Sequence, residues 1–190
     1  MLPKGKMVVV VVIAIAVAAA LLAYSGIAKP AQESGIATNL SAGDYAPNEP
    51  FLLTNGTLTN LSAYRGHEVV LWFVATWCSG CAQGNEILNS SYGAFEKNGV
   101  KVIELELYKD LGYSGENIES FVKSFAPQAY SSNVVIPAYS SYNMTMAYDR
   151  QGYLDIYYLI SPNGRILYTN GPLAATLQDL INEINKTGVV

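Results

Sequence analysis

The pattern of apolar and polar positions divides the chain into an apolar leader and a mixed, globular part. Residues 7–28 carry no charge and consist largely of Val, Ile, Ala and Leu. A run of about 18 apolar residues is long enough for a membrane-spanning helix, whereas the apolar core of a signal peptide is usually shorter. We therefore expect residues 1–28 to form a retained N-terminal transmembrane helix. The alternative is a cleaved signal peptide, because Gly26-Ile27-Ala28 is typical of a cleavage site.

The charges around the leader predict which side of the membrane the remaining chain occupies. Lys4 and Lys6 precede the apolar run and should stay in the cytoplasm, so the domain should lie outside the cell membrane. Residues 29–48 are small and polar, which favours a linker. The globular domain is expected over residues 49–190, on a single-pass membrane protein.

Apolar periodicity in the rest of the chain predicts an α/β domain. Residues 69–75 form an unbroken apolar run, as expected for a central strand buried on both faces. In chain order the expected elements are a hairpin over 51–61, a strand over 69–75, a helix from about 78 to 97, a strand over 100–107, a helix over 115–126, a hairpin over 156–169 and a helix from Pro172. The order β-α-β-α-β-β-α, after a short β element, predicts a central mixed sheet flanked by helices on both faces.

Charge and small polar motifs narrow the choice of partner and compartment. The chain carries 11 basic and 15 acidic residues and no basic stripe of the kind that nucleic acid requires, so no nucleic-acid partner is expected. Sequons of the form Asn-x-Ser/Thr are about three times as frequent as random placement would give. This excess favours an exported glycoprotein over a merely Ser/Thr/Asn-rich composition, and it suggests an archaeal envelope. The candidate N-glycosylation sites are Asn39, Asn55, Asn60, Asn89, Asn143 and Asn185.

The two cysteines of the chain carry its most specific chemical signal. Cys78 and Cys81 stand three positions apart, directly after the predicted buried strand and at the start of the predicted helix. The free N–H groups and the dipole at a helix N-terminus stabilise a thiolate, which lowers the cysteine pKa and makes it a nucleophile. We predict that Cys78, at the exposed end, attacks a disulfide, and that Cys81, one turn further in, resolves the mixed disulfide.

Other roles for the cysteine pair fit the sequence less well. Closing a four-residue loop removes little entropy from the unfolded chain, which argues against a purely structural disulfide. A structural zinc site needs four ligands, and the chain offers two cysteines and His67 unless the metal is shared across a dimer. The pattern therefore requires neither a metal nor a cofactor.

The residues around the pair resemble a known family. The segment 66–81, with Thr76 and Trp77 directly before the first cysteine, is similar to the signature of membrane-anchored thioredoxin-like thiol–disulfide oxidoreductases of the TlpA type, in the redoxin family. The segment 158–166 resembles the strand–turn–strand hairpin of the same family. The resemblance covers residues 51–184 and implies a thioredoxin fold.

The resemblance also implies a function. It implies that Cys78 and Cys81 form a redox-active disulfide, and that their reduced, dithiol form reduces exported proteins or apocytochromes with electrons from a donor in the membrane. Two alternatives remain, a thiol peroxidase and a metal- or copper-handling binding module. The residue spacing that peroxidases show before the cysteine and the downstream histidine of copper-handling relatives are both missing, which weakens each alternative.

Three positions depart from the family pattern. The cis-proline that faces the cysteines in relatives falls here on Leu154 or Asp155. Trp72 stands where cytosolic thioredoxins carry a buried acid, and Gly84 stands where membrane-anchored relatives often carry a glutamate. If Asp155 faces Cys78, its charge should raise the thiol pKa and favour the disulfide, which predicts a reductant.

Glu104 and Glu106 are the candidate replacements for the missing acids. They share one face of the strand over 100–107, and Glu106 lies nearer to its C-terminal end, where reactive groups gather in open α/β sheets. The alternative is that both side chains point to solvent. His67, at the opposite end of the strand that precedes the cysteines, is expected on the surface.

Overall fold

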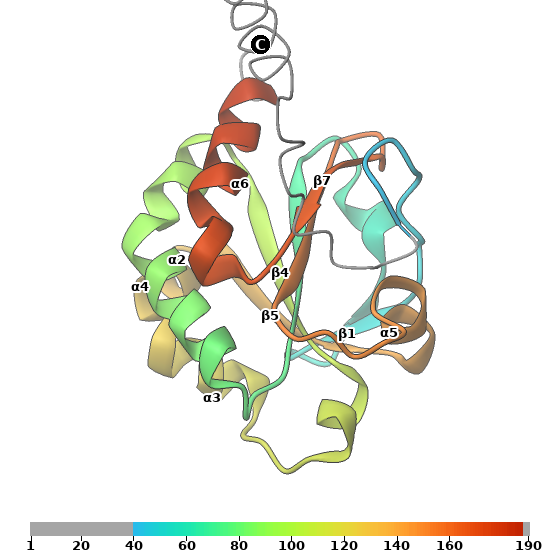
Figure 1. Ribbon diagram of the computed structural model, residues 1–190, viewed down its shortest axis with the longest axis vertical. Helices are drawn as coiled ribbons and strands as arrows, with labels where there is room; N and C mark the ends of the chain where they lie inside the picture. The colour runs from blue at the N-terminus through green and yellow to red at the C-terminus, as the bar shows by residue number, and fades with distance from the viewer. Residues whose placement is uncertain (1–39, 188–190) are drawn as a thin grey trace, which may run out of the picture. The chain divides into compact units, whose positions relative to one another are not determined.

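The computed structural model describes residues 40–187 (Figure 1). The predicted membrane anchor over 1–28, the first part of the predicted linker and Asn39 lie outside these residues. Within residues 40–187, no helix is both long enough and apolar enough to cross a membrane.

A seven-stranded mixed sheet forms the centre of the domain and confirms the predicted fold class. Its strands are β1 (Phe51–Leu53), β2 (Leu58–Thr59), β3 (Val69–Val74), β4 (Lys101–Glu106), β5 (Val135–Ser140), β6 (Ile156–Ile160) and β7 (Ile166–Asn170). Their spatial order is β2-β1-β5-β4-β3-β6-β7. β3, β4 and β5 run parallel, whereas the other neighbouring pairs are antiparallel.

Helices cover both faces of this sheet (Figure 1). One face carries α2 (Ser79–Lys97), α3 (Ile118–Phe125), α4 (Pro127–Ser131) and α6 (Leu173–Thr187), and the other carries α5 (Tyr142–Tyr148) and the 3-10 helix η1 (Leu61–Tyr64). α2 and α6 lie side by side on their face of the sheet (Figure 1). A second 3-10 segment, η2 (Tyr108–Gly112), follows β4.

The unbroken apolar sequence of β3 reflects its burial on both faces, since all six of its residues are buried. Val70, Trp72 and Val74 belong to the core cluster beneath the four-helix face. The alternate residues of the same strand belong to the second cluster, together with Met144 and Tyr148 of α5. β3 therefore anchors both cores and holds its C-terminal end, where the cysteines follow, in a fixed position.

β5 is the central element that sequence periodicity misses. It contains Pro137, and a proline inside an apolar run argues against a central strand. In the structure Pro137 lies opposite Glu104 of β4, and its carbonyl accepts a hydrogen bond from the Thr54 N–H (3.4 Å) where the β1 ladder ends. The N–H that Pro137 lacks would face the end of β1, which is only three residues long, so few hydrogen bonds of the sheet are affected. Because β5, α4 and α5 are additional elements, the order β-α-β-α-β-β-α predicted from the sequence is incomplete.

The domain also begins earlier than the predicted boundary at residue 49. The Gly43 N–H donates to the Ile166 carbonyl (2.8 Å), and the Ala46 N–H donates to the Gly164 carbonyl (2.9 Å). Tyr45 forms an isolated β-bridge with Arg165. Residues 43–46, which composition assigns to the linker, therefore pair through their backbone with the β6–β7 hairpin. Their small polar side chains give no sign of this pairing in the sequence.

Candidate active site

Cys78 and Cys81 lie where β3 gives way to α2. Cys78 is the N-cap of α2, and its N–H donates to the Ala75 carbonyl (3.0 Å). Its Sγ accepts the backbone N–H of Cys81 at 3.2 Å. Both cysteines are free thiols in this structure. An N–H group of the first helical turn therefore points at the sulfur of Cys78, which is an arrangement that stabilises a thiolate.

The two thiols differ in exposure and in acidity. Cys78 is 9% exposed and Cys81 is fully buried. The pKa of Cys78 is lowered to about 7, chiefly because its sulfur accepts a hydrogen bond from the Cys81 thiol, while burial and the charge of Asp155 oppose this effect. The same hydrogen bond, followed by burial, raises the pKa of Cys81. The thiolate therefore forms on Cys78, and the proton stays on Cys81.

Of the two residues that align with the cis-proline, Asp155 is the one beside the cysteines. Asp155 is 2% exposed, has φ of 69°, and donates its N–H to the Phe73 carbonyl (3.0 Å). Burial raises its pKa to about 6, and the nearby backbone of Leu173 and the hydrogen bond from the side chain of Trp72 partly offset this. Leu154 instead packs, half-buried, against both core clusters.

The other two departures from the family pattern belong to the same structural unit. The indole N–H of Trp72 donates to Asp155 Oδ1 at 2.7 Å. The indole ring lies over Gly84, where an added Cβ would come within 2.8 Å of Trp72 Cζ2. The fully buried Trp72 therefore takes the space that a side chain at position 84 would need, and it supplies the hydrogen bond that holds Asp155.

Thr76 and Trp77, which precede Cys78, are held by an acid that sequence reasoning missed. The carboxylate of Asp110 accepts hydrogen bonds from the Thr76 N–H (2.9 Å) and the Thr76 hydroxyl (2.7 Å). The Asp110 carbonyl accepts the indole N–H of Trp77 (2.9 Å). Gly115 closes over this contact, since an added Cβ would lie 1.9 Å from both side chains. The sequence feature that indicates Asp110 is its place just after a predicted strand, because the loops that follow parallel strands meet at one edge of the sheet.

Asp110 belongs to a strained turn. Lys109, Asp110 and Leu111 have φ values of 52°, 53° and 58°, so three successive non-glycine residues of η2 are left-handed. Each left-handed residue costs about 1–2 kcal/mol. The hydrogen bonds from Thr76 and Trp77 stabilise this turn against the cysteine loop, and such strain is concentrated at functional sites.

The two candidate glutamates occupy different environments. Glu104 is fully buried, and its Oε1 accepts a hydrogen bond from Asn85 Nδ2 (2.7 Å), which also donates to the Cys81 carbonyl (3.3 Å). Burial raises the pKa of Glu104 to about 8. Glu106 is half-buried, and its pKa is raised to about 7 by burial and by the charge of Asp110. Of the three carboxylates, Asp155 is the one whose charge acts on both thiols.

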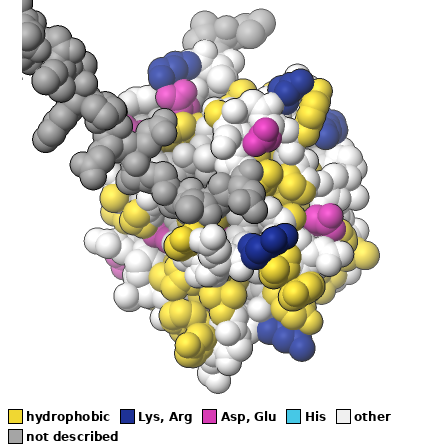
Figure 2. Space-filling view, turned by 45° about the vertical axis from the view of Figure 1, so that its right-hand side comes forward, with side chains coloured by type: hydrophobic (Ala, Val, Ile, Leu, Met, Phe, Trp, Pro, Cys, Tyr) yellow, Lys and Arg dark blue, Asp and Glu magenta, His cyan; other side chains and the backbone are white. Residues whose placement is uncertain are grey.

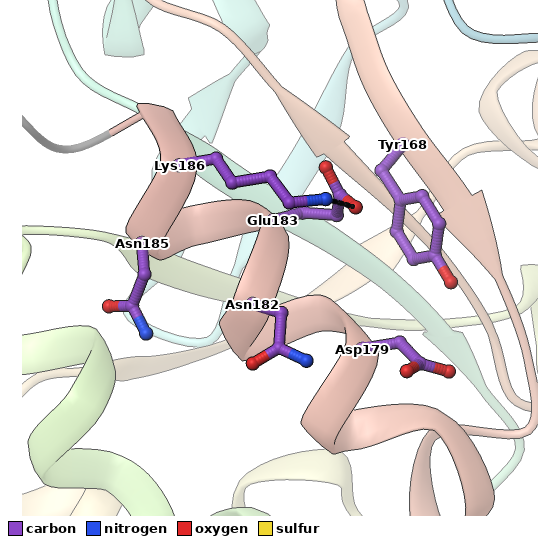
Figure 3. A pocket seen from close by; sticks show the side chains of 6 residues that line it. All are labelled: Tyr168, Asp179, Asn182, Glu183, Asn185 and Lys186. Carbon is purple, nitrogen blue, oxygen red and sulfur yellow. Dashed lines mark hydrogen bonds and ion pairs between the residues drawn. The ribbon is translucent and has the colours of Figure 1, made fainter.

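The remaining candidates lie away from the pair. His67 is exposed in the segment that precedes β3. Within residues 40–187, no group of three or more His, Cys, Asp or Glu side chains is placed to hold a metal. An open groove of about 490 Å³ lies on α6 and β7 (Figure 3). Its lining residues on α6 start at Asp179, whereas Asp155 contacts the start of that helix, so the groove is separate from the thiols.

Five of the six sequons lie within the described residues, in two kinds of environment. Asn55, Asn143 and Asn185 are exposed, in the β1–β2 turn, on α5 and on α6. Asn60 caps η1 with its side chain. Asn89 accepts two backbone N–H groups at the start of α4, at 2.9 and 3.1 Å.

A cysteine pair between a central parallel strand and the following helix, in a mixed sheet of this order, defines a thioredoxin-like protein. The chain belongs to the redoxin family, whose model matches residues 41–175. It is similar to the thiol–disulfide oxidoreductases ResA of Geobacillus kaustophilus (32% identical over 90 residues) and Geobacillus thermodenitrificans (30% over 88 residues). Each alignment covers 46% of this chain and 48% of the relative, so the chain spans about half the length of the curated relatives it matches.

Solved structures agree on the fold. A candidate protein disulfide isomerase from Bacteroides thetaiotaomicron has a TM-score of 0.57 and 26% identity, covering 80% of this chain and 94% of that chain. A SCO1/SenC family lipoprotein from Bacillus anthracis has a TM-score of 0.60 and 15% identity, covering 78% and 98%. The second likeness shows the fold alone, so the choice of function depends on the residues of the site.

Proposed function

We propose that the protein is a thiol–disulfide oxidoreductase that reduces disulfides in exported proteins or apocytochromes. The observation that carries the proposal is the thiol pair, in which Cys78 Sγ accepts the Cys81 N–H at 3.2 Å and the two pKa values move apart. The likeness to the ResA proteins, whose name describes this chemistry, supports the same conclusion.

The exchange proceeds in two steps in which atoms and electrons balance. The Cys78 thiolate attacks one sulfur of the substrate disulfide, forms a mixed disulfide and releases the other sulfur, which takes a proton. Cys81 then loses its proton and attacks Cys78 Sγ, which releases the second substrate thiol. Two electrons have passed to the substrate, and the protein holds a Cys78–Cys81 disulfide that a donor must reduce.

The direction of transfer follows from the carboxylate beside the thiols. The charge of Asp155 raises the pKa of both cysteines, which disfavours the thiolate of the reduced form. Strong oxidants of this fold class have a stabilised reduced form, and Asp155 works in the opposite sense. This balance favours a reductant.

The proposed location is the outer face of the cell membrane, with a single N-terminal span. The uncharged run over residues 7–28 and the preceding Lys4 and Lys6 support it. A membrane protein is then the natural electron donor. After carbonate extraction the protein should remain in the membrane pellet and be released by detergent, whereas a soluble protein that begins near residue 29 would indicate a cleaved leader.

Exposed aromatic pairs, one of them next to Cys78 in the sequence, support a polypeptide as substrate. Trp77 and Tyr113 are 40% and 67% exposed, and their ring centroids lie 4.8 Å apart. Tyr108 and Tyr142 form a second exposed pair at 5.6 Å. Figure 2 shows hydrophobic side chains gathered toward the lower end of the face it views, with basic side chains among them. Aromatic rings of this kind can pack against an extended chain.

The sequons support N-glycosylation of the exported domain, and their number is the reason for proposing an archaeal envelope protein. Asn55 is the best-placed glycan acceptor, because it is exposed in a tight turn, where its side-chain oxygen accepts a hydrogen bond from the nearby Thr57 N–H (3.0 Å).

Reduction of insulin disulfides tests the proposed function. The full chain in detergent, supplied with dithiothreitol, should accelerate insulin precipitation, and Cys78→Ser should abolish the acceleration. Consumption of peroxide, or stoichiometric uptake of copper, without insulin reduction would favour the peroxidase or the metal-binding module instead.

A further inference from the structure

One oxygen of Asp155 is fixed, and the other is left without a partner beside the thiols. Oδ1 accepts the Trp72 indole N–H at 2.7 Å, and the Asp155 backbone N–H donates to Phe73. Oδ2 is buried and accepts no hydrogen bond from the residues that the structure describes. A buried carboxylate oxygen without a partner is costly, so its retention needs a reason.

Gly80 creates a small space between this oxygen and the nucleophile. A Cβ added at Gly80 would lie 3.8 Å from Cys78 Sγ and 3.9 Å from Asp155 Oδ2. Both distances are ordinary van der Waals contacts, so a methyl group at Gly80 would touch both the sulfur and the carboxylate oxygen. A water molecule or a substrate sulfur has a similar size and would touch both groups.

We propose that Asp155 is the proton-transfer residue of the thiol pair, which takes the Cys78 proton and delivers it to the leaving thiolate of the substrate across the space at Gly80. The inference rests on the proposed function and adds a residue to it. Trp72 is a positioning residue, because it acts only by holding Oδ1.

The proton balance of the first step is then complete. Cys78 first gives its proton to Asp155 in a rapid equilibrium. As the Cys78 thiolate then attacks, the substrate S–S bond breaks while the new S–S bond forms. The departing sulfur leaves with the electron pair and receives the proton from Asp155. The pKa values of Asp155 and Cys78, about 6 and about 7, are close enough for the proton to move either way.

Two further titratable groups face Asp155. Cys81, on the same turn of α2 as Cys78, feels its charge and keeps its own proton during the first step. Glu104 on β4 also interacts with Asp155, but burial keeps its pKa at about 8, so it is neutral over most of the range in which Asp155 and Cys78 exchange a proton.

Dependence on the leaving group tests the proposal. The full reduced chain in detergent would be mixed with oxidised glutathione, whose alkyl thiolate needs a proton, and with dithiobisnitrobenzoate, whose aromatic thiolate leaves without one. Asp155→Asn should slow single-turnover exchange with oxidised glutathione by about 100-fold, the usual contribution of general acid–base catalysis. Exchange with the aromatic disulfide should be unchanged or faster. Asp179→Asn, at an exposed acid of α6, is the matched control.

Each other outcome overturns the proposal. Equal slowing with both disulfides would mean that Asp155 is only structural, and equal acceleration would mean that only its charge matters. If the wild-type chain exchanges with the disulfides and Asp155→Asn gives either of these two results, the role of Asp155 in proton transfer is wrong and the proposed function stands. No exchange by the wild-type chain with either disulfide removes the proposed function as well.

Gly80→Ala provides a second variant that leaves Asp155 in place. The added methyl group makes only ordinary contacts and favours helix, so the variant should fold. It should fill the transfer space and reproduce the selective loss with oxidised glutathione. Gly93→Ala, at an exposed position of the same helix with nothing within 4 Å of the added Cβ, should behave like wild type. Wild-type kinetics in Gly80→Ala would contradict the proposed path.

Discussion

The indole N–H of Trp72 donates a 2.7 Å hydrogen bond to Asp155, a residue 83 positions further along the chain. The bond joins β3 to the residue just before β6, and the same indole covers Gly84 of α2. The three departures from the family pattern, at positions 72, 84 and 155, are therefore in contact with one another and form one structural unit. A carboxylate stands beside the thiols from a different element, held by the tryptophan that replaces the usual acid.

The roles of the two cysteines predict opposite trapping behaviour. Cys81→Ser should accumulate a mixed disulfide with substrate, because Cys78 can attack but nothing resolves the product. Cys78→Ser should accumulate none, because Cys81 is fully buried and its burial, which the variant keeps, raises its pKa. Non-reducing electrophoresis of both variants after incubation with a disulfide-containing protein would distinguish them. Adducts through Cys81 would reverse the assignment.

Asp155→Asn should make the nucleophile more acidic and the protein less reducing. The Asp155 charge raises the pKa of Cys78, so removing it should move that pKa below about 7. The wild-type potential should lie nearer to that of thioredoxin, about −270 mV, than to the oxidising value of about −120 mV. The variant should be higher by on the order of tens of millivolts, where 30 mV corresponds to about 1.4 kcal/mol.

The pH dependence of this difference has a definite sign. Asp155 repels the thiolate only when it is ionised, and its pKa is raised to about 6. Rates of Cys78 alkylation should therefore differ most between wild type and Asp155→Asn near pH 7, where Asp155 is ionised and Cys78 is titrating, and should converge in more acidic solution. An unchanged potential in equilibrium with glutathione buffers, together with superimposable alkylation profiles, would contradict the electrostatic argument.

The parts of this centre that sequence can predict are the local ones. Apolar runs and helical spacing identify β3, α2 and α6, because each is long and strongly patterned. The strand-to-helix position of Cys78 and Cys81 follows from the same patterns. β5 escapes because Pro137 interrupts a run that is otherwise strand-like, and only the end of β1 tolerates the missing N–H.

The remaining parts depend on contacts between distant segments. Asp110 and Thr76 are 34 positions apart, and nothing local in either segment indicates the pairing. Alignment places Leu154 and Asp155 equally well opposite the cysteines, and only the backbone of the loop before β6, with its left-handed Asp155, selects between them. Glu104 and Glu106 share a strand face in sequence, but the depth of cover over each one separates their environments.

Gly115→Ala should weaken the support of the cysteine loop. A Cβ at this position would lie 1.9 Å from both Thr76 Oγ1 and Asp110 Oδ2, so their hydrogen bond must break or the loop must move. We expect a loss of about 2 kcal/mol in the free energy of unfolding, with slower exchange because Trp77 and Cys78 shift with the loop. Gly93→Ala serves as the control in thermal and denaturant unfolding, and equal stability of the two variants would contradict this support.

Sequon occupancy should follow the environment of each asparagine. Mass spectrometry of the native protein should find glycan on Asn55 before Asn60 or Asn89, whose side chains cap η1 and α4. Asn89→Ala should also destabilise the protein by about 1 kcal/mol, the usual value of an N-cap. Asn143→Ala, at an exposed sequon, is the control. Full occupancy at Asn89 would contradict the capping role.

Glu104→Gln should raise stability at neutral and alkaline pH and flatten its pH dependence. Glu104 is fully buried, and burial raises its pKa from 4.5 to about 8, so the folded protein holds a proton that the unfolded chain releases. A raised pKa of this kind makes the folded state most stable below about pH 4.5 and removes that stability as pH rises toward 8. Among the described residues, neither Asn85 Oδ1 nor Glu104 Oε2 has a hydrogen-bond partner. A glutamine at position 104 carries no ionisable proton, and its amide N–H can donate to Asn85 Oδ1. The melting temperature of the variant should therefore exceed that of wild type at pH 8 and approach it near pH 5.

Glu86→Gln, at an exposed position of α2, controls for the change in net charge. If Glu104→Gln and wild type had parallel pH profiles, the buried carboxyl of Glu104 would not be the group that titrates.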